Sequence, residues 1–441
     1  MIEKIIQENI NKSFLIAYSG GLDSTVLLYK LLKIKKKKNI QIRAIHINHN
    51  LNPLSIKWTK HCQKICIINQ IPLIIKNIQI KNIISNIEEK LRIQRYNIFY
   101  KNLLHNEILL TGHHVNDQCE TFILSLKRGS GPTGLSCMSV KTSLGRKTII
   151  RPFLNVTKKE LELWAKKNQL TWIEDISNFQ INYDRNFIRT KIIPVFEQRW
   201  PYFINNCLRT IKICQKETKL LNYFLRKKIF YFIKFNDCLN IQKFKNMKED
   251  MCTALIRYWL SFKKIKIPSY KSIQYIYKQM VFSRQDANPK IILKNYEIRR
   301  YQSSLYFVKT QPNIQNKLLF WHNPKKTLKL PNYLGYLKLS LYGGNQLPAP
   351  KNNELINIRF QYEGKILILG RDQKRQIKKI WQEKKIPPWL RNQIPLLFYN
   401  NLFIAAIGVF VINLDITDRN YWTVSWESHL ELSHDNIFNF Y

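Results

Sequence analysis

Residues 13–24 read Ser-Phe-Leu-Ile-Ala-Tyr-Ser-Gly-Gly-Leu-Asp-Ser, an apolar run that ends at a pair of glycines. The run at 13–18 predicts a short strand, and the apolar residues at 26–32 predict a helix. Between them, Gly20 and Gly21 let the chain turn sharply and bring backbone N–H groups close to an anion. The start of the helix adds partial positive charge at the same place. This stretch therefore indicates a strand–loop–helix unit that binds phosphate.

The same alternation of strand and helix continues to about residue 200. Strands are predicted at 40–47, 73–80 and 107–111, and helices at 54–69, 88–104 and 116–127. Strands that alternate with helices predict a parallel sheet covered by helices on both faces. We therefore expect the fold class to be α/β, with a nucleotide-binding domain over residues 1–200.

Two further domains are expected beyond residue 200. The spacing of Cys207, Ile211, Cys214, Leu221 and Leu225 predicts a helix, and so a mainly helical domain over 201–310 that binds the substrate. Strand-like pieces at 290–293 and 304–308 are expected at its end. Over 331–441, short β-like runs and a basic helix at 373–385 predict a small α+β domain.

Composition narrows the range of partners. The net charge is +43, from 72 Lys+Arg against 29 Asp+Glu, which indicates a phosphate-bearing partner such as nucleic acid or anionic lipid. The alternative is a compositional bias, because the chain is rich in Lys, Asn and Ile, as an AT-rich genome would encode.

The same sequence argues against a membrane or secreted protein. It contains no run of ~18 uncharged apolar residues and no signal-peptide pattern, so we expect no membrane contact. Its eight cysteines are scattered without a CxxC pair, which indicates free thiols and a cytoplasmic location.

The loop Ser19-Gly20-Gly21-Leu22-Asp23-Ser24 is the strongest chemical signal, and we expect all six residues to contact the nucleotide. It differs from the GxxxxGK[ST] loop and lacks that loop's lysine. A loop with a carboxylate and no lysine suits a magnesium–pyrophosphate leaving group, with Asp23 as a Mg²⁺ ligand. The alternative is an ordinary glycine turn in which Asp23 and Ser24 cap the helix.

A second signal, at residues 111–121, also falls where a predicted strand meets a predicted helix. Asp117 and Glu120 are three residues apart and so share one face of that helix. Ligands of an open parallel sheet bind at the carboxyl ends of its strands, so Asp23 and Asp117 could converge on one metal ion. The alternative is that the two acids only complement the helix dipole.

Two weaker signals accompany these. Arg92 and Arg95 lie one turn apart on a predicted helix, and arginine can grip phosphate with two hydrogen bonds. A solvated basic face is the alternative. The glycine-rich segment at 128–135 could cover phosphates or substrate.

Together these residues resemble the PP-loop ATP pyrophosphatases, whose loop reads SGGxDS, and more specifically the tRNA(Ile)-lysidine synthetase family. The matching segments also include Ile45-His46-Ile47-Asn48-His49, Arg92-x-x-Arg95-Tyr96, Arg151-Pro152-Phe153-Leu154, Trp172-Ile173-Glu174-Asp175-x-Ser177-Asn178, Tyr183-Asp184-Arg185-Asn186-Phe187-Ile188-Arg189, Asn295-Tyr296-Glu297-Ile298-Arg299-Arg300-Tyr301, Ile386-Pro387-Pro388-Trp389 and Ile394-Pro395-Leu396-Leu397-Phe398. The SGGxDS loop indicates only the superfamily, whereas the WxEDxSN, DRNxxR and IPPW segments are far more specific.

The resemblance implies a two-step ligase. ATP adenylates the wobble cytidine of the isoleucine tRNA with a CAU anticodon and releases pyrophosphate, and free L-lysine then displaces AMP to give lysidine. The sequence leaves open whether the protein forms a homodimer.

The resemblance also implies roles for residues. Asp23 and Asp117 would hold Mg²⁺, Glu120 would orient the metal shell or the lysine amine, and Arg92 would stabilise charge as the adenylate forms. The resemblance would place Arg185, Asn186 and Arg189 close to the RNA. The helix at 373–385 would contact the tRNA backbone through its basic side chains, which surround an apolar seam of Ile377, Ile380 and Trp381. These basic residues are Lys374, Arg375, Lys378, Lys379, Lys384 and Lys385. The family often has Asp where this chain has Asn116, so no catalytic role is expected there.

Other interpretations stay open. A tRNA thiolase of the iron–sulfur type would need clustered cysteines, and an amidotransferase-type synthetase would need a terminal glutaminase domain with a cysteine nucleophile. A tRNA-binding protein with an inactive loop is the interpretation from a different class. The intact loop and Asp117 favour the ligase.

Overall fold

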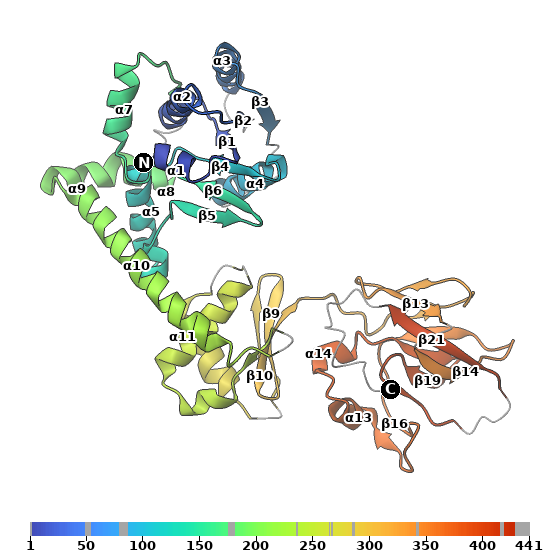
Figure 1. Ribbon diagram of the computed structural model, residues 1–441. Coiled ribbons are helices and arrows are strands. Elements are labelled where there is room, and N and C mark those ends of the chain that lie inside the picture. The colour runs from blue at the N-terminus through green and yellow to red at the C-terminus, as the bar shows by residue number, and fades with distance from the viewer. Residues whose placement is uncertain are drawn as a thin grey trace. The chain divides into compact units, whose positions relative to one another are not determined.

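The structure is a computed structural model that describes residues 2–48, 54–78, 87–174, 181–234, 237–263, 265, 268–284, 287–340, 344–414 and 419–427. The chain divides into two compact units, Met1–Asn222 and Tyr223–Tyr441. Figure 1 shows the elements of each unit, and each is described by itself.

A six-stranded sheet with the order β3-β2-β1-β4-β6-β5 forms the centre of the first unit. Five of these strands are parallel: β1 (Ser13–Ala17), β2 (Ile42–Asn48), β3 (Leu73–Asn77), β4 (Glu107–Leu110) and β6 (Lys147–Ile150). The expected parallel sheet is therefore confirmed. The edge strand β5 (Lys141–Leu144), which we did not foresee, is antiparallel, because it forms a hairpin with β6.

Helices cover both faces of this sheet, as expected. Phe14 and Ile16 of β1 pack on one face against Val26 and Leu27 of α2, whereas Leu15 packs on the other face. This alternation follows from the two-residue period of a strand. The first face is covered by α2 (Leu22–Lys35), α3 (Ser55–Ile68) and α7 (Lys158–Lys167), and the other by α4 (Ile87–Asn102). The unit also contains α1 (Ile2–Gln7), α5 (Val115–Lys127), α6 (Pro132–Leu135), α8 (Asp184–Phe187), η2 (Ile188–Ile192) and α9 (Ile193–Arg199).

The long helix α10 (Phe203–Ile229) begins in the first unit and ends in the second. Its predicted apolar stripe is buried at Cys207, Ile211, Cys214 and Leu225, but Leu221 is 52% exposed. The predicted helix is therefore confirmed, and Leu221 lies between the two stretches of α10 that contact separate hydrophobic cores.

The N-terminal part of the second unit combines helices with an antiparallel sheet of order β7-β10-β9-β8. Leu225 and Ile229 of α10 pack with Trp259 and Leu255 of α11 in its core. The strand-like pieces expected near residues 290 and 304 are present as β8 and β10. The elements are β7 (Leu239–Asn240), η3 (Gln242–Asn246), α11 (Glu249–Phe262), α12 (Tyr270–Tyr275), η4 (Ile276–Val281), β8 (Lys290–Leu293), β9 (Tyr296–Tyr301) and β10 (Ser304–Lys309).

The C-terminal part contains antiparallel sheets of order β11-β15-β18-β19-β20 and β12-β13-β21-β14, and the pair β16-β17. The basic helix expected at 373–385 is shorter, because residues 375–376 pair with β16 before α13 begins, but its seam of Ile377, Ile380 and Trp381 is buried as expected. The elements are β11 (Leu319–Phe320), β12 (Leu328–Lys329), β13 (Tyr336–Leu339), β14 (Asn345–Pro348), β15 (Ile356–Arg359), β16 (Lys365–Ile366), β17 (Arg375–Gln376), α13 (Ile377–Glu383), α14 (Pro388–Arg391), β18 (Leu396–Tyr399), β19 (Leu402–Ala406), β20 (Phe410–Val411) and β21 (Tyr421–Glu427).

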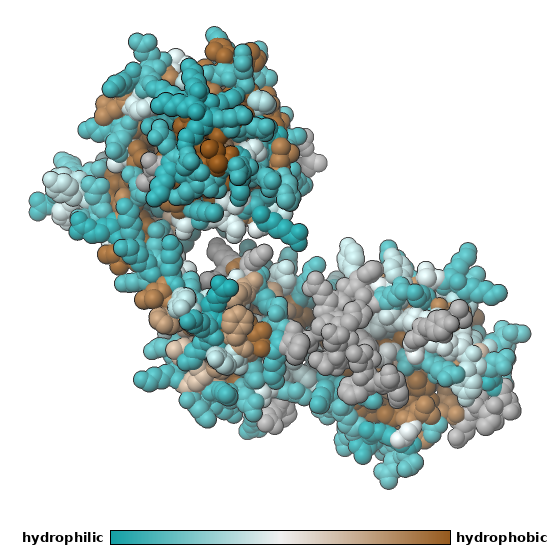
Figure 2. Space-filling model, viewed as in Figure 1, coloured by the Kyte–Doolittle hydropathy of each residue, from teal (hydrophilic) through white to brown (hydrophobic). Residues whose placement is uncertain are grey.

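Two surface properties bear on partners. The visible face of the first unit in Figure 2 is mostly hydrophilic, as the 72 Lys+Arg residues lead one to expect. None of the helices in the described ranges combines the length and apolar character needed to cross a bilayer.

The separate cores predict that a cavity in one unit loosens that unit alone. Leu27 and Leu255 are both fully buried, the first beneath the parallel sheet and the second against α10. Leu27→Ala and Leu255→Ala should each destabilise their own unit by about 2–5 kcal/mol. Hydrogen-exchange mass spectrometry of the full chain should show faster exchange confined to residues 1–222 or 223–441, respectively. Faster exchange across both units in either variant would contradict the division.

Candidate active site

The glycine-rich loop follows β1 and has room for no side chain at its first glycine. Gly20 has a φ of +85°, and a Cβ there would lie 2.8 Å from Ile173 Cδ1 and 2.9 Å from Cys62 Sγ. Ile173 also donates its backbone N–H to the Gly20 carbonyl at 2.9 Å. Ile173 and Cys62 therefore pack against the loop at Gly20, whose backbone is in a conformation that glycine adopts without strain.

Hydroxyl groups fix the rest of the loop. Ser24 Oγ accepts the Ser19 N–H at 3.2 Å and donates to the Gly21 carbonyl at 3.0 Å. The N-cap residue of α2 is Gly21, which supplies no side-chain cap, so neither Asp23 nor Ser24 acts as the cap. Because no side chain caps this helix start, its first N–H groups can face a bound anion.

The loop after β4 lies directly against Asp23. A Cβ on Gly112 would lie 3.0 Å from the Asp23 carbonyl carbon and 3.1 Å from its Cβ. Since β4 neighbours β1 in the sheet, the carboxyl ends of two adjacent strands meet here, as predicted. Sequence reasoning did not single out Gly112, although a glycine directly after a predicted strand was a usable signal.

His114 joins the two predicted carboxylates. Its Nε2 lies 3.6 Å from Asp23 Oδ2 and 3.6 Å from Asp117 Oδ2. His114 Nδ1 accepts the Asn116 N–H at 3.2 Å, so a neutral imidazole carries its proton on Nε2, between the two acids. Asp117 Oδ2 also accepts the His114 N–H at 2.9 Å, which closes a capping box at the start of α5. The structure therefore brings Asp23 and Asp117 together.

The two carboxyl groups are held in different electrostatic states. Burial alone would raise the pKa of Asp117, but His114, His113 and Arg185 outweigh it and lower the pKa to about 2. Burial raises the pKa of Asp23, and the charge on Asp117 raises it further, against the opposing effect of His114. Ionising both acids at once is therefore costly unless a cation is added.

These residues fit a magnesium ion. Asp23 Oδ1 is buried and is one of the few such side-chain atoms in the described ranges without a hydrogen-bond partner. No group of three or more His, Cys, Asp or Glu residues that could hold a metal occurs in the part of the chain that the structure describes. Mg²⁺ commonly takes one or two carboxylates and completes its shell with water and substrate phosphates, so two aspartates suffice.

Glu120 lies one turn further along α5 and is fully buried. Its Oε2 accepts from Arg185 Nε at 2.9 Å, and its Oε1 accepts from Arg189 Nε at 2.6 Å. Arg189 also approaches Asp117 Oδ1 at 3.5 Å. Burial would lower the pKa of Arg189, but the carboxylates of Glu120, Asp117 and Asp23 raise it. Glu120 thus holds two guanidinium groups beside the aspartates, a link that sequence reasoning missed.

Arg92 contacts an aromatic ring of its own helix. Its guanidinium lies 5.5 Å from the ring centroid of Tyr96 on the same helix, α4. Burial would raise the pKa of the Tyr96 hydroxyl, but Arg151, Arg92 and Arg95 lower it. Arg92 therefore belongs to a group of cations around Tyr96 and makes no ion pair with Asp23 or Asp117 in the described ranges.

Asn116 has a structural contact of its own. Its side-chain oxygen accepts the Lys158 N–H at 3.0 Å, which ties the start of α7 to α5. The positive charge of Lys158 favours the ionised form of Asp23 and so opposes part of the rise in the pKa of Asp23 that burial causes. Lys158 is thus a further candidate at the site. His49, Asp175, Ser177 and Asn178, which were quoted for the resemblance, lie outside the described residues.

Three parts of the chain match family models of known proteins. A family model for the PP-loop domain matches residues 1–196, one for the TilS substrate binding domain matches 239–306, and one for the TilS substrate C-terminal domain matches 356–426. The tRNA(Ile)-lysidine synthase of Buchnera aphidicola subsp. Acyrthosiphon pisum is 66% identical over 441 residues, with 100% of both chains covered. That of the Schizaphis graminum subspecies is 61% identical over 447 residues, again with 100% of both covered.

Among solved structures, the U34-tRNA thiolase NcsA from Methanococcus maripaludis with its [4Fe-4S] cluster is 17% identical. It covers 46% of this chain and 72% of its own, with a TM-score of 0.40, which is too low to support an inference.

The buried Glu120 cluster predicts two separable effects of mutation. Glu120→Gln should destabilise the first unit, at most by the roughly 3–5 kcal/mol of a broken buried ion pair, because both arginines are partly exposed. It should also weaken ATP binding by about tenfold or more, since Arg189 is released from its place beside Asp117. Urea unfolding and ATP titration measure the two effects.

Glu107→Gln is the matched control. The side chain of Glu107 is equally buried, and its Oε2 lies 2.7 Å from Nη2 of Arg43, so its ion pair does not involve the aspartates. It should lower stability and leave ATP affinity unchanged. Equal ATP affinity in both variants would show that the Glu120 cluster has only a structural role.

Proposed function

The chain belongs to the tRNA(Ile)-lysidine synthase family, and from this membership we propose how its residues divide the reaction. It is an ATP-dependent ligase that acts on tRNA and has tRNA(Ile)-lysidine synthase activity. The observation that carries the assignment of the site is the meeting of Asp23 and Asp117 at the ends of adjacent strands, with His114 between them.

In the first step, the carbonyl oxygen of the wobble cytidine of the CAU-anticodon isoleucine tRNA attacks the α-phosphate of ATP, and pyrophosphate leaves. The loop at residues 19–24 receives the pyrophosphate on its backbone N–H groups, and its Gly20 conformation permits that close approach. Asp23 and Asp117 hold Mg²⁺, which when bound neutralises negative charge on the phosphate oxygens.

The remaining charges of the site are supplied by this chain. His114 Nε2–H faces both aspartates and keeps them oriented. Arg189 and Arg185, held by Glu120, stabilise negative charge that develops on the phosphates. Arg92, from the group of cations around Tyr96, stabilises the adenylate.

We assign Glu120 the part of a positioning residue. Both of its oxygens accept hydrogen bonds from arginines, and Arg189 gives it a second bond at 3.1 Å. Glu120 therefore orients the site through Arg185 and Arg189, which lie against carboxylates here.

In the second step, the side-chain amine of free L-lysine attacks the activated carbon of the cytosine ring. The lysine ammonium group first gives one proton to solvent, so that the neutral amine can attack. The new C–N bond forms as the bond from that carbon to the AMP oxygen breaks, and the nitrogen then releases a second proton to solvent and keeps one N–H. Adenylation makes this possible because the unactivated carbonyl is a poor electrophile and AMP is a good leaving group.

The regions at 201–310 and 331–441 provide the surface for tRNA. On and beside α13, Lys374, Lys378, Lys379 and Lys385 are exposed, while Arg375 pairs with Glu383. These lysines contact the RNA backbone without reading sequence, so binding weakens as salt rises.

The eight cysteines are free thiols, which is consistent with the reducing environment of the cytoplasm.

Separating the two half-reactions tests this function. The full chain should release pyrophosphate from ATP only with the CAU isoleucine tRNA, and should release AMP only when L-lysine is added. Asp23→Asn and Asp117→Asn should each lower pyrophosphate release by about 100-fold, as expected when one group that stabilises a charged transition state is removed.

Asp250→Asn is the control, because Asp250 is an exposed acid in the first turn of α11 in the other unit, and it should leave the rate unchanged. Pyrophosphate release without tRNA, or AMP release without lysine, would contradict the proposed order. A rate unaffected by Asp23→Asn would overturn the site.

A further inference from the structure

The end of α10 exposes aromatic rings that its own core does not use. Leu225 and Ile229 pack inward, together with Phe232 just after the helix. Tyr223, Phe224, Phe230 and Tyr231 face outward, with exposures from 54% to 83%. We call these four rings and the nearby Arg226, Lys227, Lys228 and Lys243 the α10 patch.

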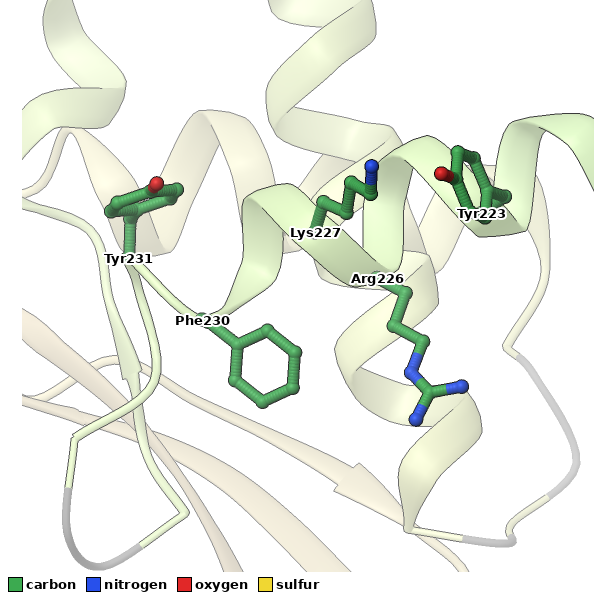
Figure 3. Close-up of a pocket in the computed structure, with 5 residues that line it drawn as sticks. All are labelled: Tyr223, Arg226, Lys227, Phe230 and Tyr231. Atoms are coloured by element: carbon green, nitrogen blue, oxygen red, sulfur yellow. The ribbon is translucent and has the colours of Figure 1, made fainter.

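The patch is hollowed. An open hollow of about 610 Å³ is lined by Tyr223, Arg226, Lys227, Phe230 and Tyr231 (Figure 3). A second hollow of about 440 Å³ adjoins it and adds Phe224, Lys228 and Lys243. Lys227 Nζ lies 4.5 Å from the centroid of the Tyr223 ring, so a cation already rests on one of the rings.

The charges of the patch favour one class of partner. Its cations are Arg226, Lys227, Lys228 and Lys243, and no carboxylate lines either hollow. Protein–protein interfaces are enriched in aromatic residues but depleted of lysine, whereas this patch carries three lysines. A polyanion that also presents flat apolar faces would satisfy both the cations and the rings.

We propose that the α10 patch binds unpaired nucleotides of the tRNA, with bases stacked on Tyr223 and Tyr231 and phosphates paired with Arg226, Lys227 and Lys228. Proteins hold single-stranded nucleic acid by combining basic side chains with aromatic rings on which bases stack. The bases must be unpaired, because an A-form duplex keeps its base faces stacked inside and offers mainly its backbone and shallow groove. This site rests on the proposed function only in that the RNA is the tRNA substrate.

Binding measurements on the full chain test the site, with the CAU isoleucine tRNA and a blunt RNA duplex of similar length as probes. Tyr223→Ala and Tyr231→Ala should each weaken tRNA binding about fivefold to 100-fold, the size expected for one base–aromatic stack. Tyr223→Phe and Tyr231→Phe keep the ring and should bind as the wild type does. All four should bind the duplex normally.

Two matched variants separate stacking from charge and from general surface effects. Tyr333→Ala removes a ring that is 86% exposed elsewhere in the same unit and should leave tRNA binding unchanged. Arg226→Gln with Lys227→Gln should reduce the slope of log affinity against log salt by about 0.7 for each phosphate that the protein no longer neutralises, whereas Tyr231→Ala should leave the slope unaltered.

Three results would overturn the proposal. They are unchanged tRNA affinity in the alanine variants, an equal loss on the duplex, and dissociation of a dimer by Tyr231→Ala in light scattering, which would make a second copy of the chain the occupant. If the alanine variants bind tRNA more weakly but the wild-type chain releases no pyrophosphate, the proposed function is contradicted and the α10 patch is still supported. Normal catalysis without tyrosine effects would do the reverse.

Discussion

The active site depends on how closely the loop after β4 can approach Asp23. Gly112 lies so near that a Cβ would come within 3.0 Å of the Asp23 carbonyl carbon. Gly20 plays the matching part in the first loop, where Ile173 and Cys62 fill the space that a side chain would need. Because neither glycine carries a side chain, the loops that follow adjacent strands β1 and β4 form a single site.

This closeness creates an electrostatic problem that the neighbouring residues solve in part. Asp23 and Asp117 both lie 3.6 Å from His114 Nε2, and neighbouring like charges oppose each other's ionisation. Arg185 and Arg189 compensate on the α5 side, and Glu120 keeps them there at 2.9 Å and 2.6 Å. Asp23 nevertheless retains a raised pKa and a buried oxygen without a partner, which a divalent cation would satisfy.

What could be predicted from the sequence was set by local pattern. The glycine pair after a strand and the alternation of strands with helices were enough to predict the parallel sheet. The rule that ligands bind at the carboxyl ends of parallel strands was enough to predict that Asp23 and Asp117 lie close together. The pairing of Glu120 with Arg185 and Arg189 could not be seen, because it joins residues 65 and 69 positions apart through a fold that no local period encodes. The antiparallel edge strand β5 was missed because the short runs at 141–144 and 147–150 pair through a hairpin that the strand–helix alternation does not indicate.

The central claim is that Asp23 and Asp117 form one cation site, and Mn²⁺ binding in the presence of a non-hydrolysable ATP analogue tests it most directly. Electron paramagnetic resonance of the full chain should show that Asp23→Asn and Asp117→Asn each weaken Mn²⁺ binding by about tenfold or more. The double variant should bind no worse than the weaker single variant, because the two residues act as a unit. Wild-type affinity in either single variant, or losses that simply add, would contradict a shared site.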